Sequence, residues 1–525
     1  MADSNSGLAS SQVESAVPLP LAAALLPVMT LVTLLIINVF IFTEDASYGP
    51  NQLALVVAAV VAGVIGWILK VPFERMLTGV KNSIGSALNA ILILLMIGAL
   101  AGTWLISGVV PAMVCYGLQI LNAEYFLVAS VVICAIVSMI TGSSWSTIAT
   151  VGVALLGIGD ALGLSGGMVA GAVISGAYFG DKMSPLSDTT NLASAMAGSE
   201  LFSHIRYMLW TTVPSIVITL IAFLVIGLMR ETTGSTEQAN ELAVAISEKF
   251  YITPWLMLVP LGTLVLVACK VDAVVALFFG SVLGAIFALI FQSGISVEHD
   301  IINEVGAGGS STLRTSVQQI AAGVFGEGSM SESIGSSAGQ FQECYIAVVQ
   351  AFTSKVEIAS GNEDAAKLMS TKGMAGMLNT VWLIICAMCF GGVMEATGLL
   401  HRITQPLVDM AQSTWALIAT TCGSCLFLNV TASDQYLAIV VPGRMFRESY
   451  ENRGLAPENL SRTLEDSGTV TSVLVPWNTC GAAQATVLGI TTLTYLPWCF
   501  FNLLSPLMSI FVAMIGFRIL KLKKA

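Results

Sequence analysis

The chain consists of long apolar runs separated by short polar stretches, and ten of these runs have the length of a membrane-spanning helix. An α-helix rises about 1.5 Å per residue, so about 20 apolar residues cross a hydrocarbon core that is about 30 Å thick. The predicted spans are residues 21–42, 53–69, 85–107, 166–197, 207–229, 254–269, 271–291, 374–398, 463–489 and 495–518. The pattern therefore predicts an all-α polytopic membrane protein.

Two further apolar segments, 125–158 and 414–446, are too short to hold two comfortable spans each. We interpret both as re-entrant hairpins. Their tips are the polar sequences TGSSWST, which begins at Thr141, and NVTASDQ, which begins at Asn429. The stretch Val109–Leu121 fits either an interfacial helix or part of the first hairpin.

The two halves of the sequence resemble each other at a nearly constant offset. The segments Asn89–Gly108 and Asn379–Gly398 align without a gap at an offset of 290 (379 − 89), and the segments that begin at Pro185 and Pro476 align at 291 (476 − 185). Such recurrence indicates an internal repeat. Each half holds five spans, an odd number, so the second half is expected to be inverted in the membrane. We predict two inverted five-helix repeats, each with a re-entrant hairpin and a broken transmembrane helix.

The distribution of positive charge predicts the orientation of these repeats, because Lys and Arg favour the cytoplasmic side. The linker Gly443–Arg462 carries four Arg residues, whereas its counterpart Gly159–Gly166 carries neither Lys nor Arg. We therefore expect this linker and both termini to be cytoplasmic. The expected organisation is a cytoplasmic tail at 1–20, a first repeat at 21–229, an extracytoplasmic linker at 230–253, a second repeat at 254–518 with a long extracytoplasmic loop at 292–372, and a basic cytoplasmic tail at 519–525.

Composition supports a membrane protein and excludes some partners. Hydrophobic residues make up 55% of the chain and charged residues only 10%, whereas soluble domains carry about 25% charged residues. The net charge of −11 argues against nucleic-acid binding. The Gly- and Ser-rich part of the loop 292–372 has no counterpart in the first half, and both a lid and a decoration fit it.

The sequence GAYFGDKMSPLSDTTNLA, from Gly176 to Ala193, places charged residues inside a predicted span. Such residues are costly at membrane depth and usually functional. Gly180 and Pro185 are predicted to break this helix, as Pro476 breaks its equivalent in the second half, and a break frees backbone carbonyls. Asp188, which follows the break among hydroxyl groups, is the first choice for an ion- and proton-binding carboxylate.

Inverted repeats bring their broken helices and hairpin tips together near the membrane midplane. Sodium is a hard cation, for which we expect oxygen ligands. The candidate ion- and proton-binding residues are Asp181, Ser187, Asp188, Thr189 and Asn191 at the first break, Thr141, Ser143 and Ser144 at the first tip, Thr431, Ser433 and Asp434 at the second tip, Asn478 and Thr479 at the second break, and Glu395 in a spanning helix. Lys182 is a candidate either for substrate binding or for an ion pair with Asp181.

Structural roles compete with several of these assignments. Asp188 could cap the helix that follows it, and Asp466 could cap the start of its own helix. Asp434, which aligns with Ser144, could stabilise its tip by hydrogen bonds, and Glu395 could lie at an interface near the cytoplasmic end of its helix.

Two CxxC pairs, Cys386/Cys389 and Cys422/Cys425, leave a more distant alternative, a membrane redox or metal-binding protein. The ten cysteines lie mostly in apolar segments, however, and no His flanks the two pairs. Buried small hydrophobic side chains are the simpler interpretation.

Three blocks, GAYFGDKMSPLSDTTNLA, TASDQYLAIVVPGRMF and DSGTVTSVLVPWNTCGA, resemble the NhaC-type sodium/proton antiporter family of the ion-transporter superfamily, and the resemblance extends roughly from Leu53 to Phe517. It implies a transporter rather than an enzyme, one that exchanges sodium for protons by alternating access across a bacterial-type inner membrane. Sodium is then a transported substrate and no cofactor is expected. The implied partners are sodium, protons and the lipid bilayer, with a homodimer as one option. Because the family also contains exchangers of malate and lactate, an organic acid exchanger on the same scaffold is the main alternative.

Overall fold

The computed structural model describes residues 20–42, 46, 48–120, 122–229, 236–269, 271–292, 295–297, 311–313, 344–358, 369–409 and 412–522. The predictions for the tail 1–19, the first part of the linker 230–253, most of the loop 292–372 and residues 523–525 lie outside these residues.

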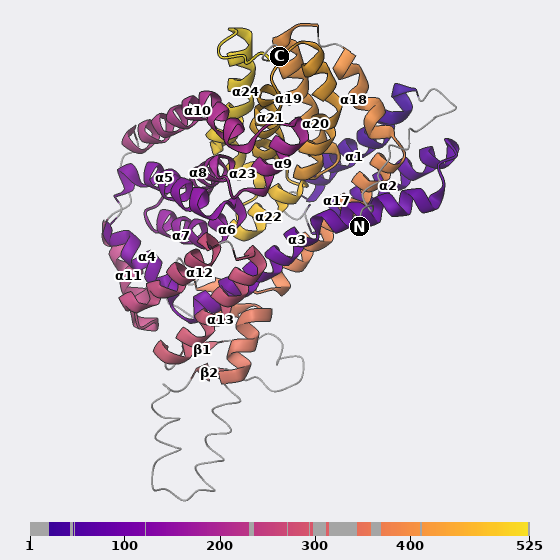
Figure 1. Cartoon of the computed structure of the whole chain (residues 1–525). Coiled ribbons are helices and arrows are strands. Elements are labelled where there is room, and N and C mark those ends of the chain that lie inside the picture. Colours follow the sequence, from indigo (N-terminus) through magenta and orange to yellow (C-terminus); the bar gives the residue numbers. More distant parts are fainter. Residues whose placement is uncertain are drawn as a thin grey trace, which may run out of the picture.

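The described chain is almost entirely helical (Figure 1). The first half contains α1 (Leu21–Phe42), α2 (Pro50–Ile68), α3 (Phe73–Ile106), α4 (Val109–Ile120), α5 (Ala123–Thr141), α6 (Ser144–Thr147), a π-helical turn (Ile148–Gly152), α7 (Val153–Ala161), α8 (Gly166–Met183), α9 (Asp188–Ala197) and α10 (Leu201–Met229). The linker contains α11 (Thr236–Lys249), and the second half begins with a 3-10 turn (Pro254–Met257), α12 (Leu258–Ala268), α13 (Ala273–Phe291) and two short antiparallel strand pairs, β1 (Ile295–Val297) with β2 (Ser311–Leu313) and β3 (Val356–Glu357) with β4 (Ser370–Thr371). The second half contains a 3-10 turn (Ala375–Met377), α17 (Leu378–Ala396), α18 (Leu399–Asp409), α19 (Thr414–Thr431), α20 (Gln435–Asn452), α21 (Pro457–Leu464), a π-helical turn (Glu465–Thr469), a 3-10 turn (Ser472–Leu474), α22 (Thr479–Leu488), α23 (Thr492–Tyr495), a 3-10 turn (Leu496–Trp498) and α24 (Phe500–Met514).

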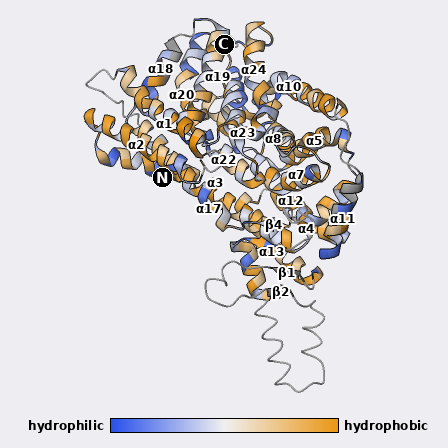
Figure 2. Cartoon of the chain, turned by 180° about the vertical axis from the view of Figure 1, so that it is seen from behind, coloured by the Kyte–Doolittle hydropathy of each residue, from blue (hydrophilic) through white to orange (hydrophobic). Residues whose placement is uncertain are grey.

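Length and hydropathy confirm a multi-pass membrane protein. Within the described residues, nine helices are long and apolar enough to cross a membrane, or up to eleven if each of two bent helix pairs counts as one span. Large apolar side chains point outward, including Phe40, which is 80% exposed, and Trp67, which is 74% exposed. Helices such as α5, α10 and α13 are mostly hydrophobic along their length (Figure 2). Lipid is the solvent that suits such a surface.

The two predicted hairpins have longer limbs than the sequence indicated. Helix α5 has 19 residues and α19 has 18, and both are long and apolar enough to cross a membrane. The expectation that these limbs are too short for a span is therefore wrong, and the re-entrant path stays a prediction. Val109–Ile120 forms the separate helix α4, which packs against α7.

The predicted cytoplasmic linker Gly443–Arg462 is mostly helical in the structure. Helix α20 continues to Asn452 and α21 begins at Pro457, so the connection between them is short. Helix α20 contains Pro442 and continues past residue 446, where the second hairpin was predicted to end.

Helix ends recur along the chain at the offset that the sequence showed. Residues with positive φ end corresponding helices at Gly108 and Gly398 (398 − 108 = 290), and at Gly142 and Ser433 (433 − 142 = 291). The side chains of Ser143 and Asp434, again 291 apart (434 − 143), both accept a backbone N–H at the start of the next helix. The caps thus pair Asp434 with Ser143, and not with Ser144 as the sequence alignment had it.

The helices form two groups, which α18 joins through contacts with α1 and α17 on one side and with α19 and α20 on the other. Helices α1, α2, α3, α13 and α17 pack on one another, whereas α5, α8, α9, α10, α19, α20, α21 and α24 pack together beside them (Figure 1). Helix α22 contacts α3 and α17 of the first group. The charged residues of the broken helices lie in the second group.

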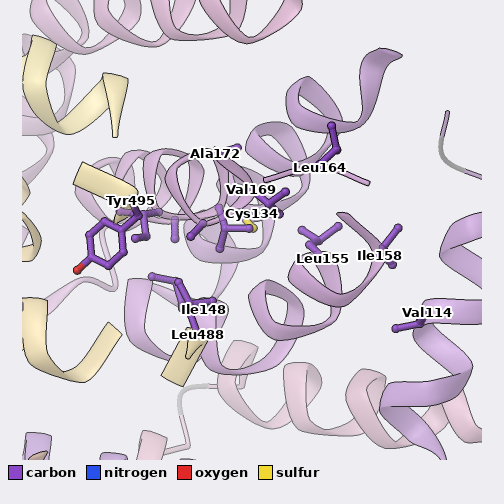
Figure 3. Close-up of a cluster of buried hydrophobic side chains, with 14 of the residues drawn as sticks. Val114, Cys134, Ile148, Leu155, Ile158, Leu164, Val169, Ala172, Leu488 and Tyr495 are labelled. Atoms are coloured by element: carbon purple, nitrogen blue, oxygen red, sulfur yellow. The ribbon is translucent and has the colours of Figure 1, made fainter. Parts of the chain in front are cut away.

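Helix α8 is held tightly against α5 inside this second group. A Cβ at Gly180 would lie 2.3 Å from the carbonyl oxygen of Ala135, so only glycine allows this approach. Figure 3 shows Val169 and Ala172 of α8 in the same buried cluster as Cys134 of α5. Gly180 is therefore a packing residue inside a continuous helix, and the prediction that it breaks the helix is wrong.

Candidate functional site

The first helix break lies between Met183, where α8 ends, and Asp188, where α9 begins, and it contains Pro185. The Ser187 side chain caps α9 by accepting the Thr190 N–H at 3.4 Å. Thr190 Oγ1 donates to the Lys182 carbonyl at 3.1 Å. Side chains next to the break thus form hydrogen bonds with some of the backbone groups that the break exposes. Charged side chains lie on either side of the break.

Asp181 is a buried carboxylate in the last turn of α8, with 5% of its surface exposed. Its Oδ2 accepts a hydrogen bond from Ser144 Oγ at 2.7 Å, which brings the first predicted tip to the first break. Its Oδ1 has no hydrogen-bond partner among the described residues. One carboxylate oxygen is therefore open to a cation or a proton.

Glu465 is a second buried carboxylate, which the sequence analysis missed. It lies in the π-helical turn after α21, is 0% exposed, and accepts a hydrogen bond from Thr189 Oγ1 at 3.2 Å. Thr189 Oγ1 also lies 3.0 Å from Ser187 Oγ. Glu465 Oε2 has no partner within the described chain, and the carboxylate lies within electrostatic range of Asp181. We call Asp181, Ser144, Ser187, Thr189 and Glu465 the acidic cluster.

A signal for Glu465 was available in the sequence. The acidic pair Glu465–Asp466 precedes Ser467 and Gly468, and two adjacent carboxylates inside an apolar span are unusual. The structure resolves this stretch as a π-helical turn, a form that is rare and often found at functional sites.

Lys182 pairs with Asp466 and not with Asp181. Both side chains are 0% exposed, and Lys182 also donates to Ser505 Oγ at 3.1 Å. Asp466 accepts further hydrogen bonds from Ser505 at 3.2 Å and from Ser509 at 2.7 Å. The expected Asp181–Lys182 pair is wrong, because Lys182 pairs with Asp466. The expected capping role of Asp466 is also wrong, because its helical segment already begins with α21 at Pro457. We call Lys182, Asp466, Ser505 and Ser509 the Asp466 cluster.

Asp188 lies outside the buried part of the site. It is exposed in the first turn of α9, and Tyr436 Oη donates to its Oδ2 at 2.7 Å. The cap of α9 is Ser187, so Asp188 is not the capping residue. Asp188 nonetheless lies within electrostatic range of Asp181. Asn191 is exposed and donates to the carbonyls of Pro185 and Ser187 at 3.0 and 2.6 Å, which closes the turn.

The second break forms a neutral hydrogen-bond network. Pro476 lies between the 3-10 turn that ends at Leu474 and the start of α22 at Thr479. Asn478 caps α22 by accepting the Cys480 N–H at 3.0 Å, and it donates to Asn429 Oδ1 at 3.1 Å. The Thr479 N–H donates to the carbonyl of Ser433 at 3.0 Å. The second tip and the second break are thus joined, as the first pair is joined through Ser144 and Asp181.

The remaining candidates are helix caps, buried hydroxyls or exposed residues. Ser143 and Asp434 are N-caps, and Asp434 accepts the Leu437 N–H at 2.8 Å, which is the tip-stabilising role considered for it. Thr431 donates to the carbonyl one turn before it, and the Thr141 hydroxyl lies 3.4 Å from Thr147 Oγ1. Glu395 is exposed in the last turn of α17.

Ser433, at the second tip, differs from the other candidates in its backbone conformation and in the surroundings of its hydroxyl. Its backbone has φ +58°, which is strained for a residue other than glycine by about 1–3 kcal/mol. Its hydroxyl is buried without a partner among the described residues. Strain of this kind is common at functional sites.

The cysteines offer little support for a redox or metal-binding protein. Cys386 and Cys389 lie in α17, Cys422 and Cys425 lie in α19, and all four are free thiols. In the part of the chain that the structure describes, no three His, Cys, Asp or Glu residues are grouped so that they could hold a metal ion. The acidic cluster instead offers two carboxylates and three hydroxyls, which are oxygen ligands.

A family model described as the Na+/H+ antiporter family matches residues 176–330 and 312–517. The chain belongs to this family. The sequence is 34% identical to the Na(+)/H(+) antiporter NhaC of Alkalihalophilus pseudofirmus over 89% of this chain and 90% of that protein. It is 32% identical to the malate-2H(+)/Na(+)-lactate antiporter of Bacillus subtilis over 86% of each chain, and 31% identical to the arginine/ornithine antiporter ArcD of Halobacterium salinarum over 94% of this chain and 92% of that protein.

The part of the chain that matches the Na+/H+ antiporter family contains most of both clusters. Asp181, Lys182, Glu465 and Asp466 all fall within the matched residues, as do Pro185 and Pro476, whereas Ser144 precedes them. Family membership makes the chain a transporter, and an enzyme activity is not expected of it. Because the relatives carry names with different substrates, the substrate has to be argued from the site itself.

Proposed function

We propose that the protein exchanges sodium for protons across a bacterial-type inner membrane by alternating access. The observation that carries the proposal is the acidic cluster, in which Asp181 Oδ1 and Glu465 Oε2 are buried without a partner among the described residues. An isolated carboxylate is stable away from water only if it is protonated or paired with a cation. Sodium and protons therefore compete for the same two groups.

In this proposal, the acidic cluster holds the sodium ion. The two carboxylates supply charge, and the hydroxyls of Ser144 and Thr189 supply neutral oxygens next to them. Release of sodium to one side leaves the carboxylates to take up protons. A cluster without sodium or protons would bury two uncompensated negative charges, which is costly in the membrane. The empty transporter therefore does not switch between its inward- and outward-facing states, and sodium movement is coupled to proton movement.

The competing proposal, organic acid exchange, requires a cation that can hold a carboxylate. Lys182 was the first choice for that role, but it is paired with Asp466. The N-termini of α9 and α22 are already capped by Ser187 and Asn478. These contacts favour a cation as the cargo over an anion.

We propose that the two halves are inverted repeats with both termini on the cytoplasmic side. The recurrence of helix ends at an offset of 290 or 291 supports the repeat (398 − 108 and 433 − 142). The four Arg residues between Gly443 and Arg462 support the orientation.

The test of function is a pH-gradient dequenching assay in proteoliposomes. Sodium, lithium, potassium and malate are added in turn to the same preparation. We expect sodium alone to collapse the gradient in the absence of any organic acid. A response that requires malate together with sodium would replace the proposal with the organic acid exchanger.

A further inference from the structure

Arg462 is a buried charged residue that has no role in the exchange of sodium for protons as proposed above. It lies near the end of α21 and is 0% exposed. None of its three side-chain nitrogens has a hydrogen-bond partner among the described residues. Its guanidinium carbon lies 4.7 Å from the centre of the Tyr207 ring on α10. Arginine remains protonated in proteins, so this is a buried positive charge without a hydrogen-bonded anion.

The ring does not compensate for this burial. The penalty for an unpaired buried ion is several times the attraction between a cation and an aromatic face. The same strip of α10 contains His204, one turn before Tyr207, whose two ring nitrogens are also buried without a partner in the described chain. We expect the side-chain nitrogens of Arg462 and His204 to gain hydrogen-bond partners in a second arrangement of α10 and α21.

Three acidic residues on the same segment are near enough in sequence to serve as the anion. Glu458, one turn earlier, accepts a hydrogen bond from Ser203 at 2.9 Å and is only partly buried. Glu465 is directed toward Thr189 of α9 in the acidic cluster. Asp466 follows Arg462 by one turn, and residues four apart lie on the same side of a helix. Tyr207, over whose ring the Arg462 guanidinium lies, is within electrostatic range of both Asp466 and Glu458.

We propose that Asp466 is shared by two cations. Lys182 holds it in the arrangement described here, and Arg462 takes it when Lys182 moves away. Lys182 belongs to α8, whereas Arg462 belongs to the same continuous segment as Asp466. A relative movement of α8 and α21 separates Lys182 from Asp466 but leaves Arg462 beside it. Arg462 is thus a positioning residue that keeps Asp466 paired during exchange, and in that respect the inference rests on the proposed function.

The first test is a thermal-unfolding cycle in detergent with Lys182→Met, Arg462→Met and the double variant, repeated on an Asp466→Asn background. We expect the double variant to lose more in Tm than the two single variants together, because Asp466 then has neither cation. On the Asp466→Asn background the excess should vanish. Additive losses on the wild-type background, or an excess that survives Asp466→Asn, would overturn the proposal.

A folding failure is also informative in this design. If Arg462→Met alone does not accumulate as a folded protein, the proposal requires that Arg462→Lys, which keeps a cation beside Asp466, accumulates normally, and a folding failure of Arg462→Lys as well would overturn it. The cycle does not depend on which ion is carried. It therefore decides the sharing of Asp466 even if sodium fails to drive proton movement in the wild-type protein.

The second test measures transport. Arg462→Met should lower the maximal rate by about tenfold or more and change the half-saturating sodium concentration by less than about twofold, a tenfold change being about 1.4 kcal/mol. Arg462→Lys, which keeps a cation, should recover most of the rate. The control is Arg447→Met, at an exposed arginine of α20 that pairs with Glu451. An unchanged rate in Arg462→Met, or a change confined to sodium affinity, would refute the role.

Discussion

Asp181→Asn is the most direct test of the acidic cluster. The amide keeps the size of the side chain and can still accept the hydrogen bond from Ser144, but it removes one of the two carboxylates of the acidic cluster. At an effective dielectric constant of about 20, a unit charge about 4 Å from a cation contributes about 4 kcal/mol. At about 1.4 kcal/mol per tenfold change, the half-saturating sodium concentration should rise by about three orders of magnitude.

The assay is sodium-driven dequenching at fixed pH, with the sodium concentration varied over as wide a range as the vesicles tolerate. Asp188→Asn is the matched control, because it makes the same chemical change at an exposed carboxylate on the other side of the break. We expect a clearly smaller shift for Asp188→Asn. If the control variant loses exchange while Asp181→Asn retains near-normal sodium affinity, the ion binds at Asp188 and the acidic cluster is not the site.

Three further predictions follow from the same contacts. Glu465→Gln should abolish sodium-driven proton movement whereas Glu395→Gln, at the exposed end of α17, should leave most of it; equal rates for the two purified variants would remove Glu465 from the mechanism. Asn478→Ala should lower the unfolding free energy by about 0.5–2 kcal/mol through the lost cap of α22, with little change in half-saturating sodium, and a shift of tenfold or more would make Asn478 an ion ligand. On a cysteine-free background, Ser165→Cys and Asn452→Cys should react with an impermeant reagent from opposite sides of the membrane, and reaction from one side only would contradict the inverted repeats.

The spans could be predicted because hydropathy alone selects them, but their ends could not. Helix α3 begins at Phe73, well before the predicted start at residue 85. Hydropathy does not detect its first turns, because they carry the charged residues Glu74 and Arg75. Helix α20 continues to Asn452, past the predicted end of the second hairpin at residue 446. Both errors arise where packing, rather than the hydrophobicity of the segment, decides how far the helix continues.

The location of the site was predictable, but the pairing within it was not. The charged residues of the sequence GAYFGDKMSPLSDTTNLA indicate the region, and Asp181 and Ser144 do meet there. The partner of Lys182 could not be read from the sequence, because Asp466 lies 284 residues away on another helix. Glycine at position 180 has the same appearance in a sequence whether it breaks a helix or packs one, and only the contact with Ala135 distinguishes the two roles.

The two clusters are built from adjacent residues that project in different directions. Neighbours along a helix point about 100° apart, so α8 presents Asp181 to the acidic cluster and Lys182 to Asp466. The facing turn does the same with Glu465 and Asp466. Because Lys182 pairs with Asp466 and not with Asp181, the open oxygens of Asp181 and Glu465 have no internal cation as a partner among the described residues, and under the proposed function sodium or protons take that place.

That separation also suggests how the ion is released. Under the proposed sharing of Asp466, Arg462 takes over the carboxylate and Lys182 becomes free without leaving a buried anion unpaired. A free Lys182, next to Asp181 in the chain, is then the nearest internal cation for the acidic cluster and competes with sodium for it. The ion pair would thus raise sodium affinity when it is closed and lower it when it is open, which is the difference between two states that an exchanger requires.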